Sequence, residues 1–213
     1  MKYLSSILIL ASTLAFGQTD PEAKAILDES IAKWQNMEAV EIQFNYSLEN
    51  VDAGVEESHD GSALLKGDKY SVKVMGYHQI SDSKTLWTVS PEMGEVMISS
   101  LDDLEGGFSP SSLLNLYETG MKVSMGETKT VNGKKVQSII LYPSSTNDKA
   151  YHRIEVGIDA SNNDLVYAYE YGKNGTTTGY LIKSLKEAKG LDQKLFTLKG
   201  YPEYANYESV DLR

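Results

Sequence analysis

Residues 40–50 read VEIQFNYSLEN, and their pattern is the clearest indication of the fold class. Its apolar side chains, Val40, Ile42, Phe44, Tyr46 and Leu48, alternate strictly with polar ones. Successive side chains of a β-strand point to opposite faces, so the pattern predicts a strand with one apolar face and one wet face. Such a strand needs neighbouring strands to pair with and a cover for its apolar face.

The rest of the chain supplies the neighbouring strands. Further strand patterns lie at 61–66, 69–75, 77–81, 84–90, 94–99, in two long strands within 121–143, and at 151–159, 164–172 and 177–188. The strongest turn signal is Asn132-Gly133, because both residues tolerate positive φ. About eleven strands joined by short turns predict a single domain built on one antiparallel sheet, strongly curved or nearly closed.

Three details of this sheet are less sharply defined by the sequence. Residues 52–60 read as a polar turn, and the tail beyond the apolar strip at 195–198 reads as an extended, tyrosine-rich piece. The inward face of the strand at 164–172 stays open, because two sets of apolar side chains compete for it. One set is Leu165, Tyr167, Tyr169 and Tyr171, and the other is Val166 and Ala168.

Two segments can cover the apolar face. Residues 20–38 place apolar side chains at helical spacing, with Asp20 as a good N-cap and Pro21 at the first helical position. This predicts an amphipathic helix that lies on the sheet.

The second cover is residues 106–120, GGFSPSSLLNLYETG. Ser109 can cap a short helix that ends at Gly120, and its apolar stripe contains Leu113, Leu114, Leu116 and Tyr117. A helix this short is unstable alone, so it must dock on the open side of the sheet. Gly106, Gly107 and Gly120 allow a hinged lid, whereas a helix fixed over an ordinary core is the alternative.

The N-terminal segment reads as a secretory signal. Lys2 precedes an apolar run from Tyr3 to Phe16, and small residues precede an expected cleavage between Gly17 and Gln18. An uncleaved anchor is the alternative. The chain has no cysteine, which excludes disulfides, thiolate metal sites and a lipid-anchoring cysteine. We therefore expect residues 18–213 to form one domain in the bacterial periplasm.

The composition argues against several kinds of chemistry. A net charge of −10 without a basic patch disfavours nucleic acid. His59, His78 and His152 are isolated in the sequence, so we expect them on strand surfaces or turns and expect no metal. There is no nucleophile elbow and no phosphate-binding loop. We expect no catalytic residue, no cofactor and no nucleotide, hence no enzyme.

Four stretches carry a resemblance to a known family. They are AILDESIAKWQNMEAVEIQFNYSLE, SDSKTLWTVSPEMGEVMI, SPSSLLNLY, and the run from YHRIEVGIDASNNDLVYAYEYG to KLFTL, which together span about residues 20 to 200. They are similar to segments of the LolA family, the periplasmic carriers of lipoproteins. The resemblance implies an unclosed β-barrel of eleven strands under helical caps, with an apolar cavity for acyl chains. It also implies acylated lipoprotein cargo, an inner-membrane releasing complex as donor and an outer-membrane acceptor, and we expect a monomer.

The resemblance also directs the choice of lipid-contacting residues. The expected set is Phe44, Tyr46, Leu48, Trp87, Leu113, Leu114, Leu116 and Ile154, although Trp87 could instead be an ordinary core residue. Family members commonly have an arginine that ties down the lid, after the strand that corresponds to ALLKGD. Here Lys66 and Lys69 stand in that neighbourhood and are weak substitutes, because lysine lacks the bidentate fork of arginine.

Two other functions fit the same scaffold. One is a non-transport sensor that binds a lipid or a lipoprotein under envelope stress, and the other is an enzyme. The sensor would need a second domain or a membrane-bound partner. The enzyme would need convergent polar side chains inside the cavity.

Overall fold

The computed structural model describes residues 19–101, 121–145 and 149–213. The expected signal peptide at 1–17 and the expected lid helix lie outside these residues. So do the lid positions Leu113, Leu114 and Leu116 and the hinge positions Gly106, Gly107 and Gly120. They stay predictions.

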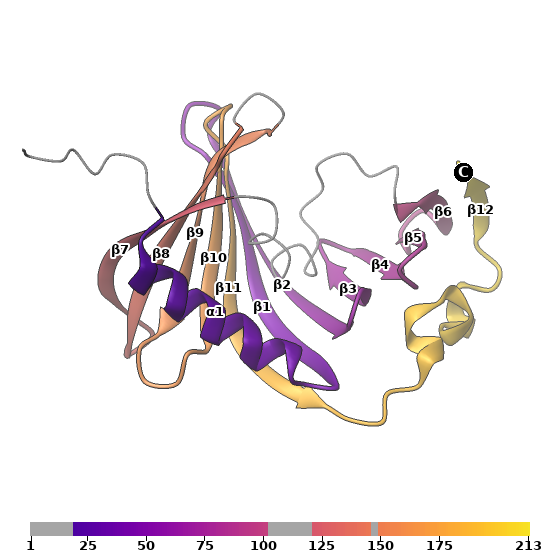
Figure 1. The fold of residues 1–213 in the computed structure, drawn as a ribbon. Helices are drawn as coiled ribbons and strands as arrows, with labels where there is room; N and C mark the ends of the chain where they lie inside the picture. Colours follow the sequence, from indigo (N-terminus) through magenta and orange to yellow (C-terminus); the bar gives the residue numbers. More distant parts are fainter. Residues whose placement is uncertain (1–18, 102–120, 146–148) are drawn as a thin grey trace, which may run out of the picture.

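The described chain is mostly β, with one α-helix before the strands and short 3₁₀ helices near its end (Figure 1). The elements are α1 (Pro21–Gln35), β1 (Ala39–Asn50), β2 (Val55–Lys66), β3 (Lys69–Val74), β4 (Tyr77–Ser81), β5 (Thr85–Ser90), β6 (Glu95–Ser100), β7 (Met121–Val131), β8 (Lys134–Pro143), β9 (Tyr151–Asp159), β10 (Leu165–Gly172), β11 (Thr177–Ala188), η2 (Gln193–Phe196), η3 (Leu198–Gly200), η4 (Pro202–Tyr204) and β12 (Glu208–Asp211).

All twelve strands belong to one sheet, in the order β12-β6-β5-β4-β3-β2-β1-β11-β10-β9-β8-β7. Every neighbouring pair is antiparallel except β12 and β6, which run parallel. The sheet does not close, because β12 and β7 lie at its two ends (Figure 1). The predicted curved antiparallel sheet, an unclosed barrel, is therefore confirmed.

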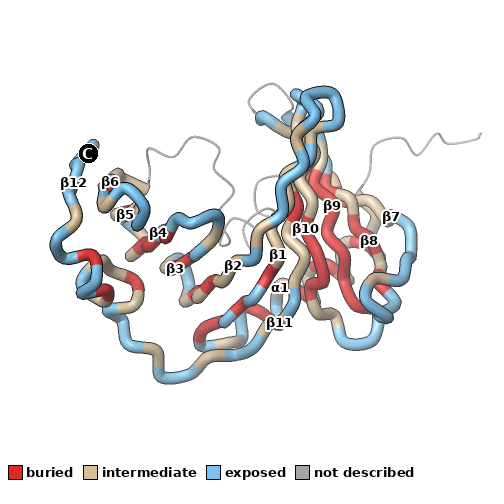
Figure 2. Tube along the Cα trace, turned by 180° about the vertical axis from the view of Figure 1, so that it is seen from behind, coloured by how far each residue is buried: buried red, intermediate tan, exposed pale blue. Residues whose placement is uncertain are grey.

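The two faces of the sheet carry separate cores. We call the face that packs against α1 the inner face and the opposite face the outer face. The main core joins Ala23, Leu27 and Trp34 of α1 to the inner face from β7 across to β5. On the outer face, the C-terminal tail packs Tyr201 and Tyr204 against β4, β5 and β6. Buried residues concentrate in the strands beside α1, whereas the tips of the hairpins and β12 are exposed (Figure 2).

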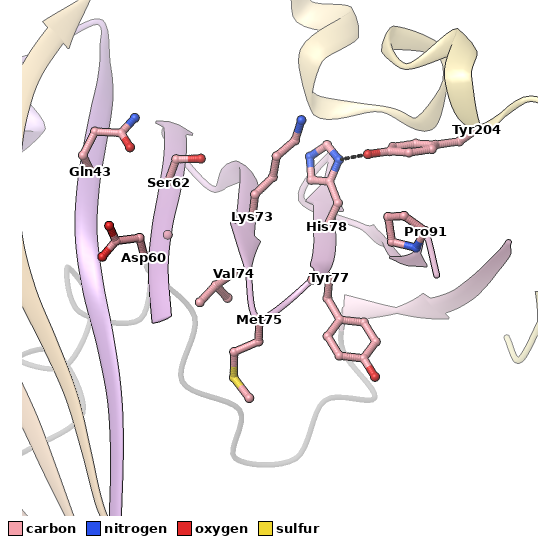
Figure 3. A pocket seen from close by; sticks show the side chains of 12 residues that line it. Gln43, Asp60, Ser62, Lys73, Val74, Met75, Tyr77, His78, Pro91 and Tyr204 are labelled. Atoms are coloured by element: carbon pink, nitrogen blue, oxygen red, sulfur yellow. Dashed lines mark hydrogen bonds between the residues drawn. The ribbon is translucent and has the colours of Figure 1, made fainter. Parts of the chain in front are cut away.

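A buried hydrogen-bond network holds the tail against the outer face. His78 Nδ1 lies 3.0 Å from Tyr204 Oη, and His78 Nε2 lies 2.8 Å from Ser71 Oγ, which in turn lies 2.8 Å from Tyr201 Oη. Figure 3 shows His78 turned toward Tyr204. His78 is only 1% exposed, so its expected place on a strand surface or turn is wrong. The tail, distant in sequence, buries it.

The helix α1 starts where the sequence predicts and is anchored at both ends. Asp20 accepts hydrogen bonds from the backbone N–H groups of Glu22 and Ala23 at 2.9 and 3.1 Å. The backbone N–H of Asp20 also donates to Val123 of β7 at 2.9 Å. These bonds satisfy N–H groups that the helix itself leaves unpaired, and they fix its first turn to the edge of the sheet.

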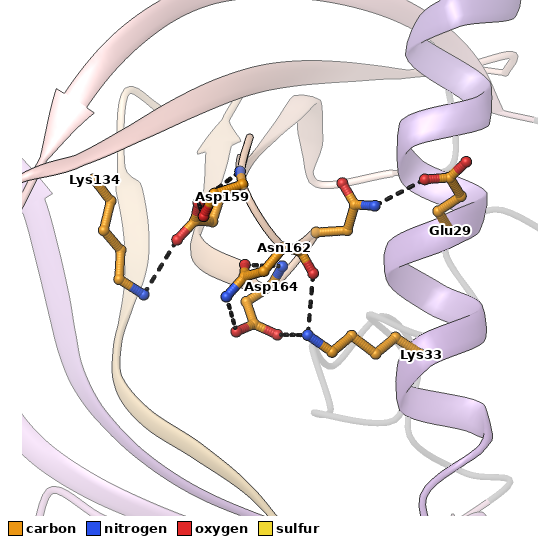
Figure 4. Close-up of polar contacts among 8 residues, drawn as sticks. Glu29, Lys33, Lys134, Asp159, Asn162 and Asp164 are labelled. Carbon is orange, nitrogen blue, oxygen red and sulfur yellow. Dashed lines mark hydrogen bonds and ion pairs between the residues drawn. The ribbon is translucent and has the colours of Figure 1, made fainter.

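The later turns of α1 bind the β9–β10 turn (Figure 4). Lys33 forms an ion pair with Asp164 and donates to the carbonyl of Asn162 at 3.1 Å. Glu29 accepts a hydrogen bond from Asn163 at 2.8 Å. The helix is thus held across the inner face from β7 to the start of β10.

Three boundaries differ from the sequence prediction. The helix ends at Gln35 rather than at residue 38, because β1 already begins at Ala39. The strand β2 begins at Val55, so the polar turn predicted for 52–60 is wrong; the polar residues there pair with the far end of β1, where solvent reaches both faces. The tail forms three 3₁₀ helices and the twelfth strand instead of a single extended piece.

The structure also settles the open parity of β10. Leu165 and Ala168 belong to the inner core, whereas Val166, Tyr167 and Tyr169 pack together on the outer face. The switch occurs because Val166 is an extra residue between Leu165 and Tyr167, which pair with Ile158 and Gly157 of β9. Such a bulge breaks the two-residue alternation, so neither competing set is entirely inward.

Candidate functional site

A group of aromatic rings lies on the inner face where β1 meets β11. The rings of Phe44 and Tyr180 have centroids 5.8 Å apart, and those of Tyr46 and Tyr180 are 5.5 Å apart in an edge-on arrangement. Gly61 of β2 pairs with Phe44, and a Cβ at Gly61 would lie 2.5 Å from the Phe44 ring. The glycine therefore makes room for the ring to lie over β2. We call Phe44, Tyr46 and Tyr180 the ring group.

A row of paired residues crosses the inner face beside the ring group. Leu141 pairs with Ile154, Ile154 with Glu170, Glu170 with Thr178, and Thr178 with Leu48. Directly paired residues of neighbouring strands point to the same face. Leu141 and Ile154 are almost fully buried, at 1% and 0% exposure. Along this row, the apolar side chains of Leu141 and Ile154 are therefore followed by the polar side chains of Glu170 and Thr178.

The described members of the predicted lipid-contacting set divide between the two faces. Phe44, Tyr46 and Ile154 belong to the inner core or pack against it, and Leu48 stands two residues beyond Tyr46 in β1. Trp87 packs on the outer face with the cluster that the tail covers, whereas its neighbour Leu86 points inward. The inner face therefore unites Phe44, Tyr46, Leu48 and Ile154 but not Trp87.

The lysines in place of the family arginine have partners elsewhere. Lys66 Nζ donates to Glu38 Oε1 at 2.9 Å, just before β1. Lys69 Nζ donates to the side chain of Gln193 in the tail at 3.1 Å.

Two residues of the inner face, Tyr180 and Glu170, are absent from the set predicted from the sequence. Glu170 looks like an ordinary wet position of an alternating strand. It shares the face of Ala168, two residues earlier, and the bulge at Val166 places both on the same inner face as Leu165. Burial raises the pKa of its carboxyl. Burial raises the pKa of Tyr46, Tyr151 and Tyr180 as well, and the charge of Glu170 adds to each of these shifts.

The outer face of β8 to β10 carries a satisfied polar cluster instead. Glu155 Oε1 accepts hydrogen bonds from Lys129, Ser138 and Tyr167 at 2.8, 2.8 and 2.9 Å, and Oε2 accepts one from Tyr171 at 3.2 Å. Burial opposes ionisation of Glu155, but these donors prevail and lower its pKa to about 2. The cluster is closed on itself and therefore offers no open position to a ligand.

Two hollows lie away from the ring group. One, of about 360 Å³, lies between β2, the β3–β4 turn and Tyr204, with Gln43, Asp60, Ser62 and Lys73 in its lining (Figure 3). Beside it, Ser71 and His78 have the spacing of a nucleophile and a base, but Ser71 is only 6% exposed and its hydroxyl also contacts Tyr201. A substrate cannot reach that hydroxyl, so the pair supports the fold rather than catalysis.

The second hollow, of about 460 Å³, lies where β10 and β11 separate. These strands pair only from Tyr167–Leu181 to Tyr171–Thr177. The extra residue Val166 in β10 and the extra residue Lys183 in β11 both line the hollow, so two facing bulges open the sheet there.

Two kinds of feature are absent from the residues that the structure describes. Among them, no group of three or more His, Asp or Glu side chains is arranged to hold a metal ion. No helix among them is both long enough and apolar enough to span a membrane.

The chain is similar to several solved structures. An uncharacterized conserved protein from Thermus thermophilus superposes with a TM-score of 0.56 at 11% identity, over 89% of this chain and 99% of that chain. A LolA superfamily protein from Nitrosomonas europaea has a TM-score of 0.44 at 13% identity, over 82% and 97% of the two chains. Lipoprotein LppX from Mycobacterium tuberculosis has a TM-score of 0.49 at 13% identity, over 82% of this chain and 100% of that chain.

Sequence comparison adds the family. No curated protein sequence matches the chain at a significant level. The family model described as outer membrane lipoprotein carrier protein LolA matches residues 77–199, which is more than half of the chain. This match covers β4 to the start of the tail, including β9, β10 and β11 of the inner face. The chain belongs to the LolA family.

Proposed function

We propose that the inner face binds the acyl chains of lipoproteins and that the protein carries them through the periplasm from the inner to the outer membrane. The observation that carries this proposal is the ring group, which packs on the apolar core of the inner face, in a member of the LolA family. Membership of a family described as outer membrane lipoprotein carriers supports the cargo class.

The energetics favour a carrier with a dry surface. Burial of each methylene is worth about 0.8 kcal/mol, so leaving one acyl chain of about 15 carbons in water costs on the order of 12 kcal/mol. The ring group supplies large apolar area with few side-chain torsions to order.

Direction of transfer must come from partners. The sequence contains no phosphate-binding loop, so the protein has no nucleotide-driven step of that kind. A donor complex at the inner membrane would load the inner face, and an acceptor at the outer membrane would bind the acyl chains more tightly. In this proposal the N-terminal segment directs export, and the segment 106–120 covers the bound chains.

The test is binding of an acylated peptide compared with the same peptide without its acyl group. We expect only the acylated peptide to bind, and Tyr46→Asp to weaken binding at least tenfold because it places a charge beside the acyl chain. Gln43→Asp adds the same charge on the exposed outer side of the same strand and should leave affinity unchanged. Equal binding of both peptides to the wild type would refute the proposal.

Mass spectrometry of protein purified without detergent gives a second readout. The proposal expects acyl-chain lipid or lipoprotein to accompany the wild-type protein and to be depleted in Tyr46→Asp. Recovery of the same lipid with both variants would place the lipid elsewhere on the molecule.

A further inference from the structure

Glu170 occupies an unusual place on the inner face. Its paired neighbour Ile154 is fully buried, and Ala168, two residues earlier on the same face, is 1% exposed. Among the described residues no side chain donates a hydrogen bond to Glu170 or forms an ion pair with it. An acidic side chain so placed forfeits part of its hydration without a protein donor in exchange, which is costly.

Glu155 shows that the lack of a hydrogen-bond donor is particular to the site of Glu170 and is not shared by every glutamate of these strands. Glu155 lies on the outer face of the next strand and receives four hydrogen bonds. Among the described residues, the charge of Glu170 acts on the ionisable groups of Tyr46, Tyr151 and Tyr180, none of them a cation at neutral pH. The carboxyl is therefore an open acceptor beside the apolar surface.

The position suits the head of an acylated ligand. Two residues of a strand span about 7 Å, so Glu170 lies about that far along β10 from Ala168, which pairs with Tyr180 of the ring group. An acyl chain that lies across the ring group can place its polar end at Glu170.

We propose that Glu170 accepts a hydrogen bond from an N–H group at the head of the bound acyl ligand, at the point where the chain joins its cargo. This inference rests on the proposed function and narrows its ligand class. An amide or an ammonium group supplies the N–H donor. An ester supplies acceptors only and leaves Glu170 unpaired.

The experiment compares three ligands that share one tail: hexadecanamide, hexadecylamine and methyl hexadecanoate. Each displaces a fluorescent fatty acyl probe from the full chain. We expect the wild type to bind the amide or the amine roughly tenfold or more tightly than the ester, as a hydrogen bond to a charged group implies. Glu170→Leu should abolish this preference and bind the ester at least as well as the wild type does.

Two further variants sharpen the result. Glu170→Gln keeps an acceptor but no charge, so it retains a preference for the amide and loses a preference for the amine. Glu41→Leu removes an exposed carboxylate from the outer side of β1 and should leave all ratios unchanged. Equal affinity of the wild type for all three ligands would refute the role of Glu170 but not the proposed function. The same holds if Glu170→Leu keeps the preference for the amide or the amine over the ester. If no ligand displaces the probe from the wild type, the proposed function fails as well.

Discussion

The ring of Tyr167 lies over Gly157 of the neighbouring strand on the outer face of the sheet. A Cβ added at Gly157 would stand 2.1 Å from Tyr167 Cε1, a distance that no real contact allows. The strands pair these two residues directly, so the ring fills the place that the missing side chain leaves. The ring is thereby held where its hydroxyl reaches Glu155 at 2.9 Å.

Gly157→Ala should therefore destabilise the protein by about 1 to 3 kcal/mol, because the methyl group must displace a buried ring. Thermal or denaturant unfolding measures the loss. The same substitution in a Tyr167→Ala background should cost much less, since the ring is gone. A full cost in both backgrounds would show that the backbone, and not the ring, resists the methyl group.

The Glu155 cluster predicts an acid-dependent loss of stability. Its pKa in the folded protein is lowered to about 2, so the stabilisation is present above the ordinary pKa of 4.5 and disappears as pH falls from there toward 2. Glu155→Gln should lower stability at neutral pH and flatten the unfolding free energy across that window. Glu56→Gln removes an exposed carboxylate of β2 and controls for net charge. Parallel curves for wild type and Glu155→Gln would contradict the prediction.

The buried imidazole of His78 leads to a second prediction, a pH-dependent change in stability at higher pH. Burial, with a contribution from Lys73, lowers the pKa of His78 to about 4 from 6.5. The unfolded chain thus binds the proton first, and stability falls as pH drops from about 6.5 to 4. His78→Gln cannot titrate and should remove this slope. Denaturant unfolding of the wild type and His78→Gln between those pH values measures the difference in slope. His152→Gln is the control, because His152 is exposed.

A substitution of His78 also tests whether its hydrogen bonds keep the C-terminal tail packed on the outer face. His78→Ala leaves the hydroxyl of Tyr204 without its partner and removes one of the two partners of Ser71, so the segment from η3 to β12 should exchange its amide hydrogens faster. Exchange in α1 and β9 should stay at the wild-type rate. Uniformly faster exchange would mean that the network stabilises the whole sheet rather than the tail.

The N-terminus of α1 gives a local prediction. Asp20→Ala removes the acceptor for two backbone N–H groups and should cost about 1 kcal/mol, whereas Asp20→Asn keeps a capping oxygen and should cost only a few tenths. Thermal unfolding of the three proteins orders them as wild type, Asn and Ala. Equal stabilities of the Asn and Ala variants would show that the cap contributes through charge alone.

Features that depend only on residues close together in the chain could be predicted from the sequence. The alternation in residues 40–50 gave β1, Asp20 and Pro21 gave the start of α1, and Asn132 and Gly133 turn with φ of 49° and 77°. Each follows from local sterics and hydrogen bonding, which need no distant partner. The family could also be predicted from short stretches of sequence.

Which side chains meet across strands could be learned only from the folded chain. A one-residue bulge at Val166 turned Glu170 inward and Tyr167 outward, and no local pattern marks where a bulge falls. Trp87 lies outside the ring group and His78 is buried because a tail more than 100 residues later covers them. Burial depends on what packs from elsewhere in the chain, and the periodicity of a strand carries no information about that.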